Sequence, residues 1–129
     1  MTTGRYSISR NRWANGELSW SDDVFKLYLT LAYVPDLVVH GTISDLTGIS
    51  FISDALTNKS VSDGYLTADD VTIASATGDP FDYIIMVDET ADCLIAAWEQ
   101  TANYKLPYSP TGVNMIFNFS QSIYGILRI

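Results

Sequence analysis

The dipeptide Asp63-Gly64 is the feature that most constrains the fold of this chain. It separates two short alternating runs, "KSVS" and "YLTADDVTIAS". A two-residue Asp-Gly connection fits a type I′ turn, whose twist matches that of two antiparallel strands. A calcium loop is the alternative for a stretch with three aspartates, but such a loop requires acids at alternate positions and a distal glutamate, which this stretch lacks. A strand would also turn the adjacent Asp69 and Asp70 to opposite faces, so they could not easily bind one ion. The sequence therefore predicts a hairpin and no metal site.

Alternating apolar residues recur along most of the chain. Apolar side chains occupy every second position of residues 25–31 and 113–119, which indicates strands with one buried face. Residues 81–89 contain the run "IIMV" and predict a central strand that is buried on both faces. The apolar segment 93–100 fits a strand, although its two alanines leave a helix open, and residues 122–129 predict a last strand.

Two irregular features are also expected between the strands. Residues 42–46 fit one turn of helix, capped by Thr42 or Ser44 and ended by Gly48. A change in the phase of the alternation after Leu56 predicts a β-bulge near Asn58-Lys59.

These segments describe one all-β domain with little helix and no repeats. The chain has 129 residues, of which 47% are apolar and 17% charged, so a disordered acidic chain is excluded. About seven or eight strands are expected, in an antiparallel β-sandwich or barrel-like fold that spans residues 17–129. Residues 1–16 are polar and predict a short N-terminal arm.

Charge separates this arm from the rest of the chain. Residues 1–16 carry three arginines and no acid, whereas residues 17–129 carry four basic and fifteen acidic residues, so the net charge of −8 divides into +3 and −11. The acidic body should repel nucleic acid and anionic membranes, and the arm could bind an acidic partner; the alternative is a solvated tail. The candidate interface residues are the arginines of the arm and the tryptophans that flank its last turn: Arg5, Arg10, Arg12, Trp13 and Trp20.

Signatures of catalysis or cofactor binding are sparse. His40 is the only histidine and Cys93 the only cysteine, which excludes an internal disulfide, a Cys-based zinc site and most nucleophile–base pairs. No phosphate loop, dinucleotide fingerprint, HExxH or GxSxG motif occurs. Cys93 is expected to be an inert core thiol and His40 a structural or surface residue. The sequence favours a non-enzymatic protein without cofactor or metal, and a small hydrolase built on carboxylates is the enzymatic alternative.

Targeting signals are likewise not evident. The segment "MTTGRYSISRNRW" contains no apolar signal region, and no apolar run approaches the length of a membrane span. We therefore expect a protein that is made and folded in a cytoplasm.

Six sequence blocks follow one another in a characteristic order. They are "WSDDVFKLYLTLAYVPD", "ALTNKSV", "ADDVTIASAT", "DYIIMVDET", "CLIAAWE" and the C-terminal "GILRI". Over residues 18–129 this order resembles a family of small virion structural proteins of tailed bacteriophages. The segment "GISFISDAL" departs from the pattern of that family, in which a turn similar to "GTGY" precedes the "ALTNK" block.

The resemblance implies a structural role on the virion. It implies a capsid decoration or cement protein that is located on the capsid surface after synthesis in the host cytoplasm, binds the major capsid protein and self-associates as a homotrimer. We expect the arm, Arg5 to Trp13, to reach the capsid or a neighbouring subunit. Two alternatives are a low-copy head–tail connector or tail component, and a carbohydrate-binding adhesion module that uses Trp13 or Trp20.

Overall fold

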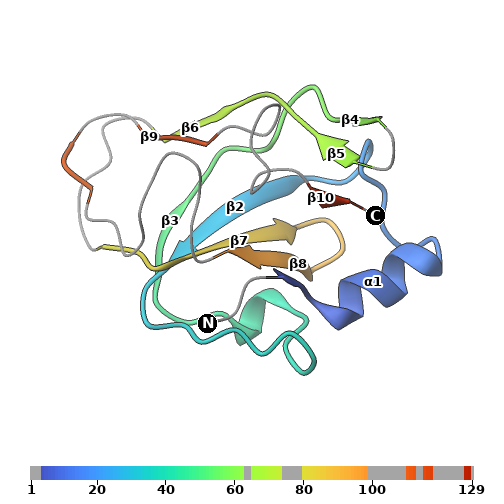
Figure 1. Cartoon of the computed structure of the whole chain (residues 1–129), viewed down its shortest axis with the longest axis horizontal. Helices are drawn as coiled ribbons and strands as arrows, with labels where there is room; N and C mark the ends of the chain where they lie inside the picture. The colour runs from blue at the N-terminus through green and yellow to red at the C-terminus, as the bar shows by residue number, and fades with distance from the viewer. Residues whose placement is uncertain are drawn as a thin grey trace.

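A five-stranded antiparallel sheet is the centre of the structure, a computed structural model that describes residues 4–62, 65–73, 80–98, 110–112, 115–117 and 127–128 (Figure 1). The strand order of this sheet is β1-β8-β7-β2-β3. Its strands are β1 (Gly4–Arg5), β2 (Phe25–Thr30), β3 (Ile49–Ile52), β7 (Tyr83–Asp88) and β8 (Cys93–Trp98).

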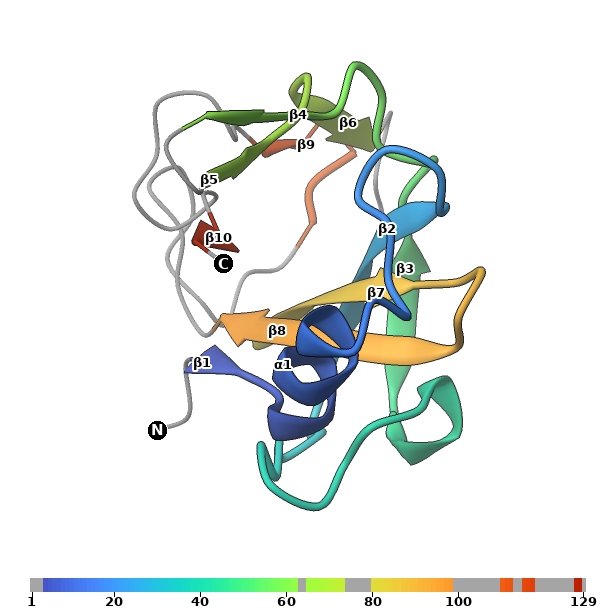
Figure 2. The same ribbon diagram turned by 90° about the vertical axis from the view of Figure 1, so that its right-hand side faces the viewer.

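Shorter strands form a second layer over one face of this sheet (Figure 2). Two small antiparallel sheets make up the layer, in the orders β10-β5-β4 and β6-β9. Their strands are β4 (Ser60–Ser62), β5 (Tyr65–Thr67), β6 (Val71–Ile73), β9 (Met115–Phe117) and β10 (Leu127–Arg128). The prediction of a mostly antiparallel β fold is confirmed.

The main core lies between the two layers, and a second core lies under the other face of the large sheet. Strand β7 contributes to both, because Ile84 and Met86 pack in the main core whereas Ile85 and Val87 pack in the second. Strand β7 lies between β2 and β8, so the predicted central strand is confirmed. The main core continues into the small sheets through Leu66, Val71 and Met115, among others.

The predicted hairpin is confirmed in its strands. Ser62 of β4 pairs with Tyr65 of β5, so two residues connect them; these two, 63 and 64, lie outside the described residues. The bulge expected near Asn58 is a turn instead, since Asn58 has a left-handed backbone (φ 50°) and β4 begins at Ser60 without a shift of register. The predicted helical turn is confirmed as η1 (Ile43–Asp45), a short 3-10 helix whose capping box joins Thr42 and Asp45.

Residues 4–14 of the expected arm are folded against the large sheet. Strand β1 pairs with β8, and helix α1 (Ser7–Ala14) packs against the same strand. Tyr6 and Ser9 are fully buried, and the helix ends at Asn15-Gly16, where Gly16 takes a left-handed backbone (φ 73°). Of the described helices, none is long and apolar enough to cross a membrane.

Candidate interaction surface

The two candidate tryptophans pack inside the protein. Trp20 is 6% exposed, its Nε1–H donates to the Ser60 carbonyl oxygen (2.9 Å), and its ring packs against Phe25 with centroids 4.6 Å apart. Trp13 is half-buried and packs against the main core, with its ring parallel to that of Phe25 at a centroid distance of 6.2 Å. Both rings join α1 and the following turn to the core, and the buried Trp20 presents no open face for a sugar ring.

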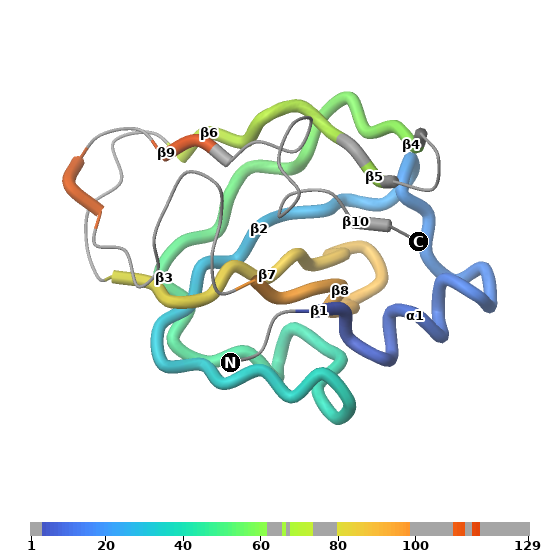
Figure 3. Tube along the Cα trace, in the orientation of Figure 1, coloured from blue at the N-terminus to red at the C-terminus, as the bar shows by residue number. Residues whose placement is uncertain are grey.

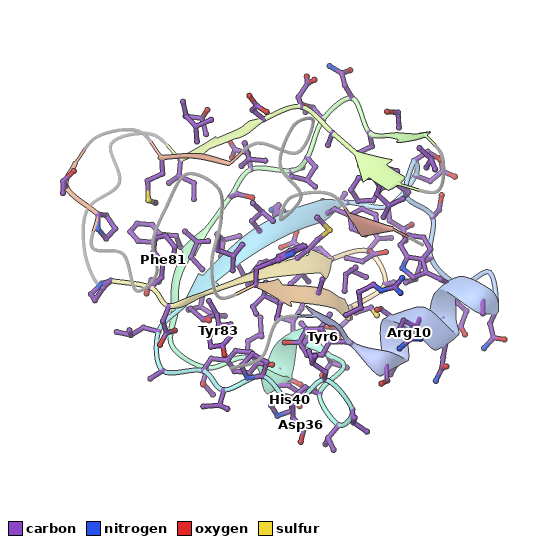
Figure 4. The ribbon with its side chains drawn as sticks, viewed as in Figure 1. Tyr6, Arg10, Asp36, His40, Phe81 and Tyr83 are labelled. Atoms are coloured by element: carbon purple, nitrogen blue, oxygen red, sulfur yellow. The ribbon has the colours of Figure 1, made fainter. Side chains whose placement is uncertain are left out.

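The three candidate arginines have different environments. Arg12 donates to the Ala91 carbonyl oxygen (3.0 Å) and forms an ion pair with Glu17 (3.3 Å), so it connects α1 to the β7–β8 hairpin. Arg5 lies in β1, is half-buried and interacts within the chain. Arg10 points outward from α1 and makes no ion pair with any described residue (Figure 4). The structure therefore does not bring the five candidates together on one surface, and only Arg10 is fully available to a partner.

A turn between β2 and η1 exposes the most apolar surface among the described residues. We call residues 33–40 the valine loop, because Val34, Val38 and Val39 are each 75–77% exposed. The loop runs under the second core, below the large sheet, and returns through η1 to β3 (Figure 3). Three largely exposed valines within six residues form an apolar patch, and such patches often mark sites of interaction.

Side-chain hydrogen bonds hold the valine loop in one conformation. Asp36 Oδ1 accepts the backbone N–H groups of Val38 (3.1 Å) and Val39 (3.0 Å), which is an Asx turn. The His40 N–H donates to the Asp36 carbonyl oxygen (2.9 Å), and the Asp36 N–H donates to His40 Nδ1 (3.1 Å). The two side chains lie together at the lower edge of the molecule (Figure 4). These hydrogen bonds order the loop, so it presents the valines at a lower entropic cost of binding.

Buried tyrosines anchor the loop to the second core. The Tyr33 hydroxyl lies 2.8 Å from both His40 Nδ1 and the hydroxyl of Tyr6. Burial and the contact with Tyr33 raise the pKa of Tyr6 well above its usual range, so the Tyr6 hydroxyl keeps its proton. The Leu37 carbonyl oxygen accepts the N–H of Ser7 (2.7 Å), which fixes the loop to the start of α1.

Helix α1 extends this surface with polar and basic groups. Ile8 is 37% exposed and packs on Gly41, at the end of the loop, where a Cβ would lie 2.8 Å from Ile8 Cγ2. Next to it, Ser7, Arg10 and Asn11 line an open hollow of about 450 Å³. Together, the valine loop and the exposed Arg10 guanidinium suit a protein partner with an apolar pocket and an acidic rim.

A buried carboxyl group, Asp88, is the strongest electrostatic feature outside this surface. Asp88 ends β7, is fully buried and accepts the Ala91 N–H through Oδ1 (2.9 Å). Its other oxygen makes no hydrogen bond of normal geometry, although Asp23 is its electrostatic neighbour. Burial, then the Asp23 carboxyl, raise the pKa of Asp88 to about 7, and the protonated Asp88 in turn lowers the pKa of Asp23. Paired carboxyls of this kind serve in hydrolases, but Asp88 is closed to solvent.

Other chemistry in the described residues is structural. Cys93 is fully buried, and burial raises the pKa of its thiol, in agreement with the predicted core thiol. Within the described ranges, no three His, Cys, Asp or Glu side chains are placed to hold a metal ion.

Comparison with family models, curated proteins and solved structures finds no match to this chain.

The valine loop was not among the residues singled out from the sequence. Hydropathy cannot tell an exposed valine from a buried one. The signal that could have found it is Asp36, because an aspartate two and three residues ahead of a pair of valines favours an Asx turn.

Proposed function

We propose that this chain is a non-enzymatic virion structural protein of a tailed phage, a decoration protein that binds the head shell. The observation that carries the proposal is the valine loop, a rigid apolar surface whose only evident use is contact with another macromolecule. The resemblance of the sequence blocks to those of small virion structural proteins is the reason to propose the major capsid protein as the partner.

The energetics suit a repeated contact on a shell. Full burial of a valine contributes about 1.5–3 kcal/mol, so three valines that are three-quarters exposed could contribute roughly 3–6 kcal/mol of gross binding energy. Losses of translational and side-chain freedom offset part of this gain, so a single contact would be weak. Many copies on a closed shell make the sum large.

The positive charge of Arg10 would add an electrostatic attraction to an acidic partner. The body of the protein is acidic, so an acidic partner would repel most of its surface. The exposed Arg10 guanidinium on α1 would attract such a partner, and its effect should weaken as salt is raised.

The test is to count copies of the chain on purified particles. Particles would be assembled in cells that supply the wild-type chain, Val38→Lys or Val61→Lys, and the chain would be quantified against the major capsid protein by mass spectrometry. Val61 is a matched control because it is 54% exposed in β4, away from the valine loop. We expect hundreds of wild-type copies per particle, at least tenfold fewer with Val38→Lys, and no loss with Val61→Lys.

Other results would change the proposal in defined ways. A dozen or fewer wild-type copies would place the protein at the connector or tail. Absence of the wild-type chain from particles would overturn the virion role. Equal loading of Val38→Lys and wild type would overturn the assignment of the valine loop as the contact.

A further inference from the structure

The two edges of the five-stranded sheet differ in how they are covered by the rest of the chain. At the β8 edge, β1 pairs with Ala96 and Ala97, and α1 covers the rest. The Ile95 carbonyl oxygen, which would otherwise face outward, accepts the N–H of Tyr6 (3.0 Å) and the hydroxyl of Ser9 (3.1 Å). Natural proteins close sheet edges in this way to prevent unwanted pairing.

Strand β3 forms the opposite edge, and no described strand pairs with its outer side (Figure 2). It carries two isoleucines at this edge, Ile49 (42% exposed) and Ile52 (50% exposed). An open edge strand with exposed apolar side chains is a template for pairing with another strand.

A β-bulge places both isoleucines on the same face of the sheet. Residues opposite each other in an antiparallel pair point to the same face. Ile52 pairs with Tyr28 and Ile49 with Thr30, two positions apart on β2, because the register shifts between Leu29 and Thr30. The extra residue, Ser50, directs its hydroxyl to the Pro80 carbonyl oxygen (3.5 Å). Without the bulge, residues 49 and 52 would point to opposite faces.

The charge pattern around β3 favours a second copy of the same chain as the partner. Residues 46–53 carry no charged side chain, in a chain with a net charge of −8. Most other surfaces of this acidic protein would repel an identical surface, whereas this neutral segment would not. An antiparallel strand pair also has the two-fold symmetry that an isologous contact between identical chains requires.

We propose that two copies of this chain associate through antiparallel pairing of their β3 strands. The contact joins two five-stranded sheets into one continuous sheet and brings Ile49 and Ile52 of both copies together on one face. The ladder is short, so the interface is smaller than a standard protein–protein interface, and we expect a dissociation constant on the order of tens of micromolar. This self-association does not depend on the proposed binding to a shell.

The test is the mass of the purified full-length chain in solution. Sedimentation velocity from about 2 to 200 µM should show a monomer–dimer equilibrium for the wild type, and Ile52→Lys should raise the dissociation constant at least tenfold. Val38→Lys is the matched control, since its valine is exposed on the valine loop, and it should dimerise as the wild type does. Thermal unfolding would verify that each variant is folded; if Ile52→Lys is not, Ile49→Lys replaces it.

The dependence of dimerisation on salt is an independent test. Asp45 and Asp54 flank the neutral segment, so antiparallel pairing brings the acidic ends of the two copies toward each other. Screening should therefore tighten the dimer between 50 and 500 mM salt. A monomer at every concentration, a trimer, or a dimer that Ile52→Lys leaves unchanged would each overturn the inference. Loss of the dimer with Val38→Lys would overturn it as well. Particle loading by a variant that no longer dimerises reports on the proposed function separately.

Discussion

Substitution of the buried carboxyl Asp88 by asparagine should stabilise the protein at neutral pH. In the folded protein the pKa of Asp88 is raised to about 7, compared with about 3.9 for an exposed aspartate. Its proton is thus held more tightly in the folded than in the unfolded chain. The Asp88 contribution to the free energy of unfolding is therefore most favourable below about pH 4, falls as the pH rises from about 4 to about 7, and is constant above that range.

The magnitude follows from the size of the shift. A difference of about three pKa units at about 1.4 kcal/mol each gives a ceiling of about 4 kcal/mol at pH 8. The lowered pKa of Asp23 offsets part of this loss of stability, because the charged form of Asp23 is favoured beside protonated Asp88. Asparagine keeps an oxygen for the Ala91 N–H and offers a permanent donor to Asp23. We expect Asp88→Asn to be more stable than the wild type by about 1–4 kcal/mol at pH 8 and by less than about 0.5 kcal/mol at pH 4.

Urea unfolding followed by tryptophan fluorescence, at pH values from 4 to 8, would measure this effect. Other carboxyls titrate in the same range. One is the partly exposed Glu89: partial burial raises its pKa, but the hydrogen bonds from Tyr28 and Lys26 outweigh this effect and lower it. The difference between Asp88→Asn and the wild type cancels their contributions. Asp22→Asn, at an exposed acid nearby, is the control and should change little at either pH. A difference that does not grow between pH 4 and 7, or a variant less stable at pH 8, would refute the reasoning.

Three further outcomes follow from individual contacts. Gly48→Ala should lower the free energy of unfolding by roughly 3 kcal/mol or more, because its backbone is left-handed (φ 62°) and a Cβ would lie 2.0 Å from the Leu31 carbonyl oxygen. Gly16→Ala, which is also left-handed but has open space around it, should lower it by only about 1 kcal/mol. Equal losses in chemical denaturation would contradict this. Tyr6→Phe should lower stability by about 1–2 kcal/mol by removing a buried hydrogen bond of 2.8 Å, and an unchanged melting temperature would argue against that bond. Cys93 should react with an aromatic disulfide reagent only in denaturant, and rapid labelling of the native protein would show that the thiol is accessible.

The positions of several strands could be predicted from local patterns, but the single buried face predicted for residues 25–31 was wrong, because β2 is buried on both faces. The alternation of 25–31 and the apolar run of 81–89 each depend only on neighbouring residues, and both became strands of the large sheet. The Asp-Gly signal of residues 63–64 likewise predicted the β4–β5 pairing. Such features succeed because strand position and hairpin geometry are set within a few residues of the chain.

Helix α1 and the position of Trp20 could not be predicted in this way. The buried side of α1 depends on Ser9, a small polar residue whose burial is stabilised by a hydroxyl bond to Ile95 on a distant strand. Trp20 was expected at an interface, but its indole N–H is paired with Ser60, forty residues later. The valine loop is exposed for the same kind of reason, because tertiary contacts of its neighbours fix its conformation. Patterns of hydropathy carry no information on these long-range partners.

The pairing of β1 with β8 has a consequence for synthesis on the ribosome. Gly4 is made well before its partner Ala97, which follows about 90 residues later. At about 5–20 residues per second, the first segment waits roughly 5–20 s before its strand partner exists. During that interval Tyr6 and Trp13 have no core to enter, and the β8 edge is completed only after nearly the whole sheet has been made. The beginning of this chain is thus among the last parts to reach its native place.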